Sequence, residues 1–281
     1  MTSLNFTMLA QNTEVDYVRQ ACVAAMSIKA TNNNSKICLL TNDSVPEKYT
    51  DLFDHIIDIP WGDHAAHENW KISNRWKIYH ATPFEQTAVI DTDMLILQDL
   101  SAWFEFLRNY DLFYTSRVFT YRGEVVNNTF YRRAFEQFEL PNLYSGFHYF
   151  KKSDLPHEFY TWLEMITNNW QQFYKQHAGG KIYQKTCSMD LSSAIAAKIM
   201  NCESKITNQR ATYPSFVHMK TKVQNWNYNL NNRWQDKIDV YLDENLNLMI
   251  GNYLQTGIFH YTEKDFLTER IEDTYCNFLG I

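Results

Sequence analysis

The sequence of 281 residues lacks the features on which secreted and membrane proteins usually depend. No segment approaches the run of about 20 apolar residues that a membrane-spanning helix requires. The N-terminus has no basic stretch followed by an apolar run of the kind found in secretory signals. The five cysteines are scattered and form no C-x-x-C pair, which argues against a disulfide framework and a structural zinc site. We therefore expect a protein of the reducing cytoplasm with no transmembrane segment.

Positive charge is also scarce. Lys and Arg number 26 against 32 Asp and Glu, so the net charge is -6 at pH 7. A protein that binds the phosphate backbone of nucleic acids usually carries a basic surface. We expect no nucleic-acid partner.

Glycine (8) and proline (6) are few, whereas aromatic residues make up 16% of the chain and hydrophobic residues 45%. This apolar content excludes a mainly disordered chain, which could not offset the entropy lost on ordering. Most of the rings are expected in the core, and some can stack on sugars or nucleobases.

Short apolar runs alternate with a helical pattern in the first 60 residues. Residues 4–9, 36–41 and 55–60 are typical of strands, and apolar residues within 15–28 recur at helical spacing. A strand, a helix and two further strands in this order begin a doubly wound sheet in which most strands are parallel.

The rest of the chain continues this alternation. A helix is predicted over 65–81, where Lys71 and Arg75 would share one face and Pro83 would stop it. The other predicted elements are strands at 87–90, 94–97, 112–119, 143–150, 215–218, 239–242, 246–250 and 257–261, and helices at 103–108, 153–173 and 189–200.

Two carboxylates, Asp91 and Asp93, follow the predicted strand at 87–90. Ligands of an open α/β sheet bind outside the carboxyl ends of its strands. Two carboxylates one residue apart at such an edge can both reach a hard divalent cation, which in turn bridges the oxygens of a diphosphate. Because D-x-D is short and common, a pair of loop aspartates with one capping a turn is the alternative interpretation.

The surrounding segment 88–104, Ala-Val-Ile-Asp-Thr-Asp-Met-Leu-Ile-Leu-Gln-Asp-Leu-Ser-Ala-Trp-Phe, resembles the nucleotide-sugar glycosyltransferases of the GT-A fold. It is most similar to their glycogenin-like and lipopolysaccharide galactosyltransferase-like family. Segment 74–84 resembles the helix that carries a basic residue before D-x-D, 142–150 resembles the N-x-G segment, and 188–191 resembles the D-Q segment. The resemblance covers residues 4 to about 265 in the family's order.

This resemblance implies a Rossmann-like α/β fold of GT-A type, with a mostly parallel central sheet, helices on both faces and an irregular C-terminal portion that closes the site. We expect one domain over 1–281, with a nucleotide-binding half at about 1–100 and an acceptor-side half at about 101–281. The implied activity is metal-dependent transfer of a sugar from a nucleoside-diphosphate sugar, with UDP-sugar favoured, to a hydroxyl of a glycan or other acceptor. The resemblance also hints at retention of configuration.

The family's functional residues map onto several positions of this chain. Asp91 and Asp93 would hold Mn²⁺ or Mg²⁺ against the donor diphosphate, and Arg75 or Lys77 would meet phosphate or sugar. Asp190 would orient the sugar or the acceptor, although the Gln of D-Q is replaced here by Leu and a helix N-cap is the alternative role of Asp190. Tyr17 or Trp61 could stack on the base. The remaining donor-binding residues expected from the resemblance are Thr7, Ala10, Asn12, Tyr17, Ser145, Gly146, Lys220 and Lys264.

A histidine is expected to complete the metal site, and two compete for this role. The family ends its site with H-x-x-G-x-x-K-P-W, and this chain offers only partial matches at 217–220 and 259–264, without the glycine or the proline. We favour His260, with Lys264 close by, as the ligand. His218 with Lys220 would then face the donor phosphate or the acceptor.

Two other functions remain open. Asp91-Thr-Asp93 also matches haloacid-dehalogenase-type phosphatases, in which Asp91 would be the nucleophile and Asp93 the acid/base. That family places Thr or Val after the second Asp, whereas Met94 follows here. A non-catalytic GT-A-like binding module is the other alternative, because the C-terminal motif is degraded.

Overall fold

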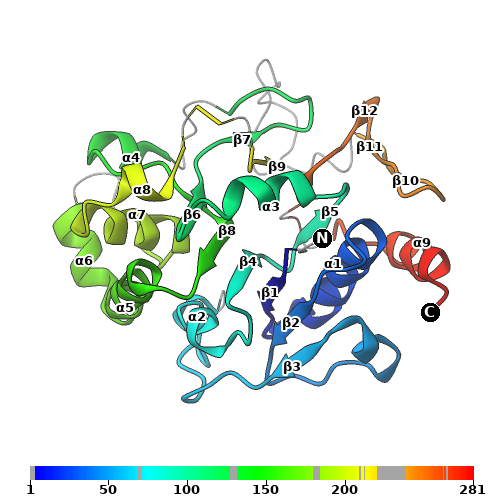
Figure 1. Cartoon of the computed structure of the whole chain (residues 1–281), viewed down its shortest axis with the longest axis horizontal. Helices are drawn as coiled ribbons and strands as arrows, with labels where there is room; N and C mark the ends of the chain where they lie inside the picture. Colours follow the sequence, from blue (N-terminus) through cyan, green and yellow to red (C-terminus); the bar gives the residue numbers. More distant parts are fainter. Residues whose placement is uncertain are drawn as a thin grey trace.

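A computed structural model describes residues 4–68, 71–126, 132–179, 184–208, 210–211, 213–219, 238–261, 263 and 265–281. Its central sheet has six strands in the order β3-β2-β1-β4-β8-β6 (Figure 1). Strands β1 to β4 run parallel, and β8 runs antiparallel to both β4 and β6. The predicted α/β class with a mostly parallel sheet is therefore confirmed. The strands are β1 (Phe6–Leu9), β2 (Ile37–Leu40), β3 (His55–Ile57), β4 (Gln86–Ile90), β6 (Leu112–Thr115) and β8 (Tyr144–Lys151).

Helices cover both faces of this sheet. Successive residues of a strand point to opposite sides, so a buried strand places apolar side chains on both faces. Phe6 and Met8 of β1 join one buried apolar cluster, which includes residues of α1, α3 and α9. Leu9 joins the other cluster, with residues of α2, α5, α6 and α7. These helices are α1 (Tyr17–Thr31), α2 (Lys77–Ala81), α3 (Ser101–Leu107), α5 (Asp154–Asn168), α6 (Trp170–His177), α7 (Met189–Ile199) and α9 (Glu269–Leu279).

A second sheet carries segments from the C-terminal part back to the middle of the chain. Its order is β5 (Met94–Ile96), β13 (Ile258–His260), β9 (Phe216–His218) and β7 (Val118–Phe119). Strand β13 is antiparallel to β5 and parallel to β9. The antiparallel strands β10 (Val240–Leu242), β11 (Leu248–Ile250) and β12 (Tyr253–Leu254) form a third sheet.

Some predicted elements differ from the structure. The single helix over 65–81 is wrong: a 3₁₀ turn at Ile72–Asn74 precedes α2, and Lys71 lies in the left-handed region with φ 52°. Lys71 and Arg75 therefore do not share a helix face. The predicted helix 153–173 is divided at Asn169 into α5 and α6, and the predicted strand 112–119 into β6 and β7. Helices α8 (Glu203–Ile206) and α9 were not predicted, whereas α4 (Arg133–Gln137) lies within 120–140, where the sequence predicts a polar loop and a helix.

Within the described ranges, no helix is both long and apolar enough to cross a membrane.

A buried serine fastens α1 to the strand that leaves the aspartate pair. Ser27 Oγ donates to Ala24 O (2.7 Å) and accepts from the Ile96 N–H of β5 (2.9 Å). The side chain is fully buried.

Ser27→Ala is expected to lower the free energy of unfolding by about 1–3 kcal/mol, because the buried Ile96 N–H loses its partner. Chemical denaturation of the variant measures this change. Thr161→Ala, which removes an exposed hydroxyl from α5, is the control and should change stability by less than about 0.5 kcal/mol. Equal stability of the two variants would contradict the proposed role of Ser27.

Candidate active site

The turn between β4 and β5 carries both aspartates, and main-chain hydrogen bonds fix it from two sides. Asp91 N–H donates to Gly146 O on β8 (3.0 Å), and Tyr261 N–H donates to Asp93 O (3.1 Å). The short buried runs Gln86–Ile90 and Met94–Ile96 leave only residues 91–93 for this turn. The two carboxylates are therefore held at the junction of the two larger sheets.

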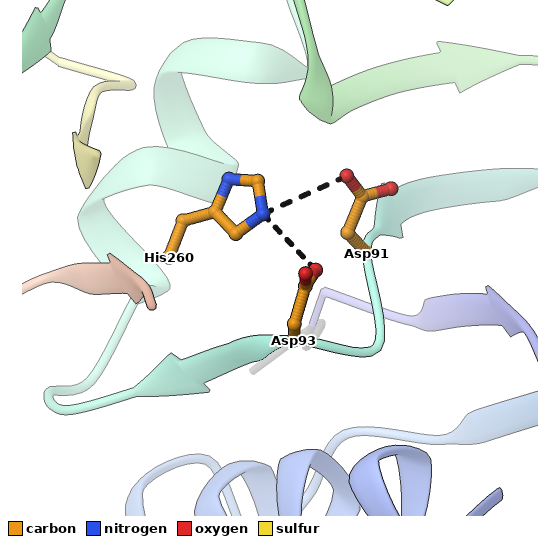
Figure 2. Close-up of side chains that lie close together, drawn as sticks. All are labelled: Asp91, Asp93 and His260. Atoms are coloured by element: carbon orange, nitrogen blue, oxygen red, sulfur yellow. Dashed lines mark hydrogen bonds and ion pairs between the residues drawn. The ribbon is translucent and has the colours of Figure 1, made fainter. Parts of the chain in front are cut away.

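His260 ends β13 opposite Met94 and brings an imidazole to the carboxylates. Its Nε2 lies 3.0 Å from Asp93 Oδ1 and 3.9 Å from Asp91 Oδ2. Figure 2 shows the ring directed toward both carboxylates. One ligand atom from each of the three residues lies within 4.8 Å of the others.

This arrangement fits a divalent cation. Two carboxylates and an imidazole are a donor set that Mn²⁺ accepts. Gly146 leaves the space around them clear: a Cβ there would stand 3.4 Å from Asp91 Oδ2, 3.4 Å from His260 Nδ1 and 2.6 Å from the Met94 side chain. His260 Nδ1 is also buried without a hydrogen-bond partner in the described part of the chain.

Arg75 supplies the positive charge beside this acidic pair. It follows the 3₁₀ turn at Ile72–Asn74, and its guanidinium forms an ion pair with Asp91 Oδ1. Burial opposes its charged form, but the nearby carboxylates of Asp91 and Asp93 raise the pKa of Arg75 above its ordinary value. Asp91 is thus shared, with one oxygen toward Arg75 and the other toward His260.

A pocket of about 160 Å³ opens beside these groups. Its lining includes residues that the sequence predicted for the site and that lie far apart in the chain. They come from the segment before α2, from strands β8, β9 and β13, and from helix α7. Its lining residues are Ile72, Arg75, Asp91, Tyr144, Ser145, Gly146, Ser188, Met189, Asp190, Phe216, His218 and His260.

Asp190 lines the same pocket from the first turn of α7. The N-cap of that helix is Ser188, whose Oγ accepts from Leu191 N–H (3.3 Å), so the alternative that Asp190 is the cap is wrong. Asp190 Oδ1 instead accepts from Ser145 N–H (2.7 Å), and Oδ2 accepts from Arg132 Nη2 (2.6 Å). Both carboxylate oxygens are therefore oriented by groups from other elements.

Arg132 was missed from the sequence. Its guanidinium carbon stands 3.6 Å from the centre of the Tyr144 ring, and Nη1 donates to Leu143 O (2.9 Å). The residue lies in a polar stretch without a motif, 58 positions from Asp190. No local signal marks such a partner.

Strand β8 bulges where it lines the pocket. Tyr114 of β6 pairs with His148 and Thr115 with Tyr144, so residues 145–147 form the bulge. His148 Nδ1 lies 2.9 Å from Ser145 O and Nε2 2.7 Å from the Tyr160 hydroxyl. Burial lowers the pKa of His148 to about 4, so the ring is neutral at pH 7. Because a carbonyl only accepts, Nδ1 carries the proton and Nε2 accepts from Tyr160.

Other predicted donor-binding residues lie elsewhere. Lys77 is fully buried and donates to Gly62 O, and burial lowers its pKa. Thr7 is buried with its hydroxyl 2.9 Å from that of Thr82, and Ala10 is fully buried at the end of β1. The structure does not place these three side chains in the pocket lining.

Asn12 lies in the loop before α1, and Tyr17 is the first residue of that helix. Asn12 Oδ1 accepts from Val18 N–H (2.9 Å), so its side chain supports the helix start. Tyr17 is half-buried, and its hydroxyl is close enough to influence Arg75. Lys220 and Lys264 lie outside the described residues.

Neither a protein-family model nor a curated protein sequence matches this chain. Among solved structures, the galactosyltransferase LgtC in complex with donor and acceptor sugar analogs aligns over 98% of this chain and 96% of its own, with 12% identity and a TM-score of 0.55. The apo structure of the bifunctional glycosyltransferase WbbM aligns over 99% of this chain and 50% of its own, with 13% identity and a TM-score of 0.52. The chain has the GT-A fold.

The chain spans less than two thirds of the length of some of the structures that it matches. The chain spans 60% of the glycosyltransferase GlyE of Streptococcus pneumoniae TIGR4, with 14% identity, 99% of this chain covered and a TM-score of 0.47. It spans 46% of the apo form of GlyE.

The positions of His260 and His218 distinguish the two candidates for the metal ligand. Their ring centres are 4.9 Å apart, yet only His260 lies within ligand distance of both aspartates among the described residues. His260→Ala is expected to weaken Mn²⁺ binding by about tenfold or more, since it removes a ligand atom. Mn²⁺ titration followed by electron paramagnetic resonance measures this.

His218→Ala is the matched control, because it removes an imidazole from the same pocket and should leave Mn²⁺ affinity nearly unchanged. A defect in the His218 variant alone would reverse the assignment.

Proposed function

We propose that this protein is a metal-dependent glycosyltransferase, which moves a sugar from a nucleoside-diphosphate sugar to an acceptor hydroxyl. The observation that carries the proposal is the cluster of Asp91, Asp93 and His260 at a pocket that Asp91 and His260 line together with Arg75 and Asp190. The fold shared with LgtC, solved with donor and acceptor sugar analogs, supports it.

Asp91, Asp93 and His260 would hold the cation. Imidazole together with carboxylates favours Mn²⁺ over Mg²⁺, which prefers oxygen ligands alone. When bound, the cation supplies Lewis-acid neutralisation of the negative charge that develops on the leaving nucleoside diphosphate. We favour a UDP-sugar as donor.

The protein's own groups would position the substrates. Arg75 carries a permanent charge whose N–H groups can form charge-assisted hydrogen bonds with a phosphate oxygen. Asp190, with its oxygens oriented by Ser145 and Arg132, offers its remaining lone pairs to a hydroxyl of the donor sugar or the acceptor. We further propose that the chain acts as one GT-A domain, in which Arg75 and Asp91 come from the nucleotide-binding half and Asp190 and His260 from the acceptor-side half.

The two other hypotheses predict different arrangements. A phosphatase would use Asp91 as a nucleophile, but an ion pair with Arg75 engages this carboxylate and the fold is shared with a galactosyltransferase. A non-catalytic binding module would retain metal and nucleotide without turnover.

Nucleotide binding tests the proposal first. Thermal-shift measurements with UDP-, GDP- and dTDP-sugars should show stabilisation by one of them that depends on MnCl₂, because a ligand that binds only the native state raises its apparent stability. Asp93→Asn should abolish the MnCl₂-dependent part of this shift. Asp51→Asn, at an exposed position, is the charge-matched control.

Turnover then separates the three hypotheses. MnCl₂-dependent hydrolysis of the stabilising donor supports the glycosyltransferase. Binding without hydrolysis or transfer supports the binding module, and hydrolysis of an aryl phosphate that requires Asp91 supports the phosphatase.

Arg75 and Lys77 are expected to act differently although they lie two residues apart. Arg75→Ala should weaken binding of UDP in the presence of Mn²⁺ by about tenfold or more, because a charge-assisted contact to phosphate is lost. Binding of Mn²⁺ alone should not weaken, since Asp91 loses a competing cation. Isothermal titration calorimetry measures both affinities.

Lys77→Met is the matched comparison. It should lower the free energy of unfolding by about 1–3 kcal/mol, because the Gly62 carbonyl loses its donor, and leave UDP affinity unchanged. Weaker UDP binding by Lys77→Met, together with unchanged UDP binding by Arg75→Ala, would assign the phosphate contact to Lys77.

A further inference from the structure

An exposed tryptophan stands outside the pocket on the turn that follows β3. Trp61 is 61% exposed, the highest value among the large hydrophobic side chains recorded as exposed in the described chain. Its ring lies flat on that of Trp76, with centroids 5.5 Å apart and an interplanar angle of 5°. Trp76 is only 4% exposed. Trp76 therefore covers part of one face of the Trp61 ring, and most of the Trp61 side chain remains exposed.

The backbone holds Trp61 in an uncommon conformation. Trp61 has φ 57° and Gly62 has φ 76°. A bulky residue in the left-handed region is strained and persists only when its surroundings fix it. Lys77 donates to Gly62 O, and Asp63 Oδ1 accepts from Asn74 Nδ2 (2.5 Å). Buried polar groups therefore fix the turn in the conformation that exposes the indole.

Histidines border this aromatic surface. His80 meets the Trp61 ring edge-on at 5.5 Å and 74°, and His64 lies 6.1 Å from the Trp76 ring. Burial lowers the pKa of His80, so its ring is neutral at pH 7 and offers one donor and one acceptor. A flat apolar face with a neutral polar group at its edge matches the chemistry of a sugar ring, which has a C–H face and a rim of hydroxyls.

The lysines near the turn are directed to the backbone. In the described part of the chain, Lys71 donates to Ala65 O and Ala66 O, Lys77 donates to Gly62 O, and Lys152 donates to Thr82 O. These hydrogen bonds orient the three ammonium groups toward main-chain carbonyls rather than toward a ligand on the indole.

We propose that Trp61, stacked on Trp76 and bordered by His80, binds a sugar ring of a neutral glycan at a site separate from the pocket. None of the three residues lines the pocket, although Trp76 follows Arg75 directly in the chain. The choice of an acceptor glycan as the source of this sugar rests on the proposed function. The site would hold a distant sugar of the acceptor chain while another sugar occupies the pocket.

Fluorine NMR of protein labelled with 5-fluorotryptophan tests this site directly. The Trp61 resonance is the one missing from the spectrum of Trp61→Phe. Maltohexaose, laminarihexaose and chitotetraose are added separately at about 10 mM, which fills most of a site of millimolar Kd. At least one of them should shift the Trp61 resonance. Trp61→Ala should weaken binding of that probe by about tenfold or more, because Trp side chains dominate such contacts.

Controls separate this site from the pocket and from general loss of an aromatic ring. Trp61→Phe, which retains a flat ring, should keep part of the affinity. Phe278→Ala, which removes an exposed ring from α9, should keep all of it. UDP binding with MnCl₂, measured on the same samples, tests the proposed function independently and should be unchanged in the Trp61 variants.

Three outcomes would overturn the proposal. These are no shift of the Trp61 resonance with any of the three saccharides, equal saccharide binding by Trp61→Ala, and a shift with uridine in place of the saccharides. The last result would assign Trp61 to the base of the donor.

Discussion

Two carboxylates that lie one residue apart at the end of a buried strand impose the main electrostatic constraint on this protein. Like charges at this separation disfavour each other's ionised form unless a cation compensates them. Arg75 forms an ion pair with Asp91, and His260 Nε2 lies 3.0 Å from Asp93 Oδ1, so each carboxylate has a neighbouring polar group of its own. Because Asp91 N–H is bonded to β8 and Asp93 O to Tyr261 N–H, the same turn also joins the central sheet to the second sheet.

The bulge in β8 connects two carboxylates that line the pocket. Gly146 O accepts from Asp91 N–H, whereas Ser145 N–H donates to Asp190 Oδ1. His148 holds the bulge through Ser145 O, and Tyr160 of α5 fixes the His148 ring. A movement of the two peptide groups at 145 and 146 would therefore displace Asp91 and Asp190 together.

Local patterns predicted the strands and the aspartate pair because buried strands are short apolar runs and Asp91 directly follows one of them. They could not choose between His218 and His260, since β9 and β13 are parallel and pair these residues in register at the same edge. The pairing of β13 with β5 decides between the two histidines, because it places His260 opposite Met94, next to Asp93. This contact joins residues 166 positions apart in the sequence. Arg132 was not predictable for the same reason, because its partner Asp190 lies on a distant helix. The predicted helix over 65–81 failed because helical spacing does not reveal a left-handed residue such as Lys71.

The interruption of that predicted helix has a structural consequence of its own. In a continuous helix the side chains of Lys71 and Arg75 would point the same way. In the observed 3₁₀ turn and α2, the neighbouring residues at 75, 76 and 77 contact different parts of the protein. Arg75 reaches Asp91, Trp76 supports Trp61, and Lys77 fixes the turn that carries Trp61. Successive helical residues point about 100° apart, so one short rigid segment serves the acidic pair on one side and the aromatic surface on another. The distance between the pocket and Trp61 is therefore set by a segment anchored at both ends, and a glycan that touches both must match that fixed spacing.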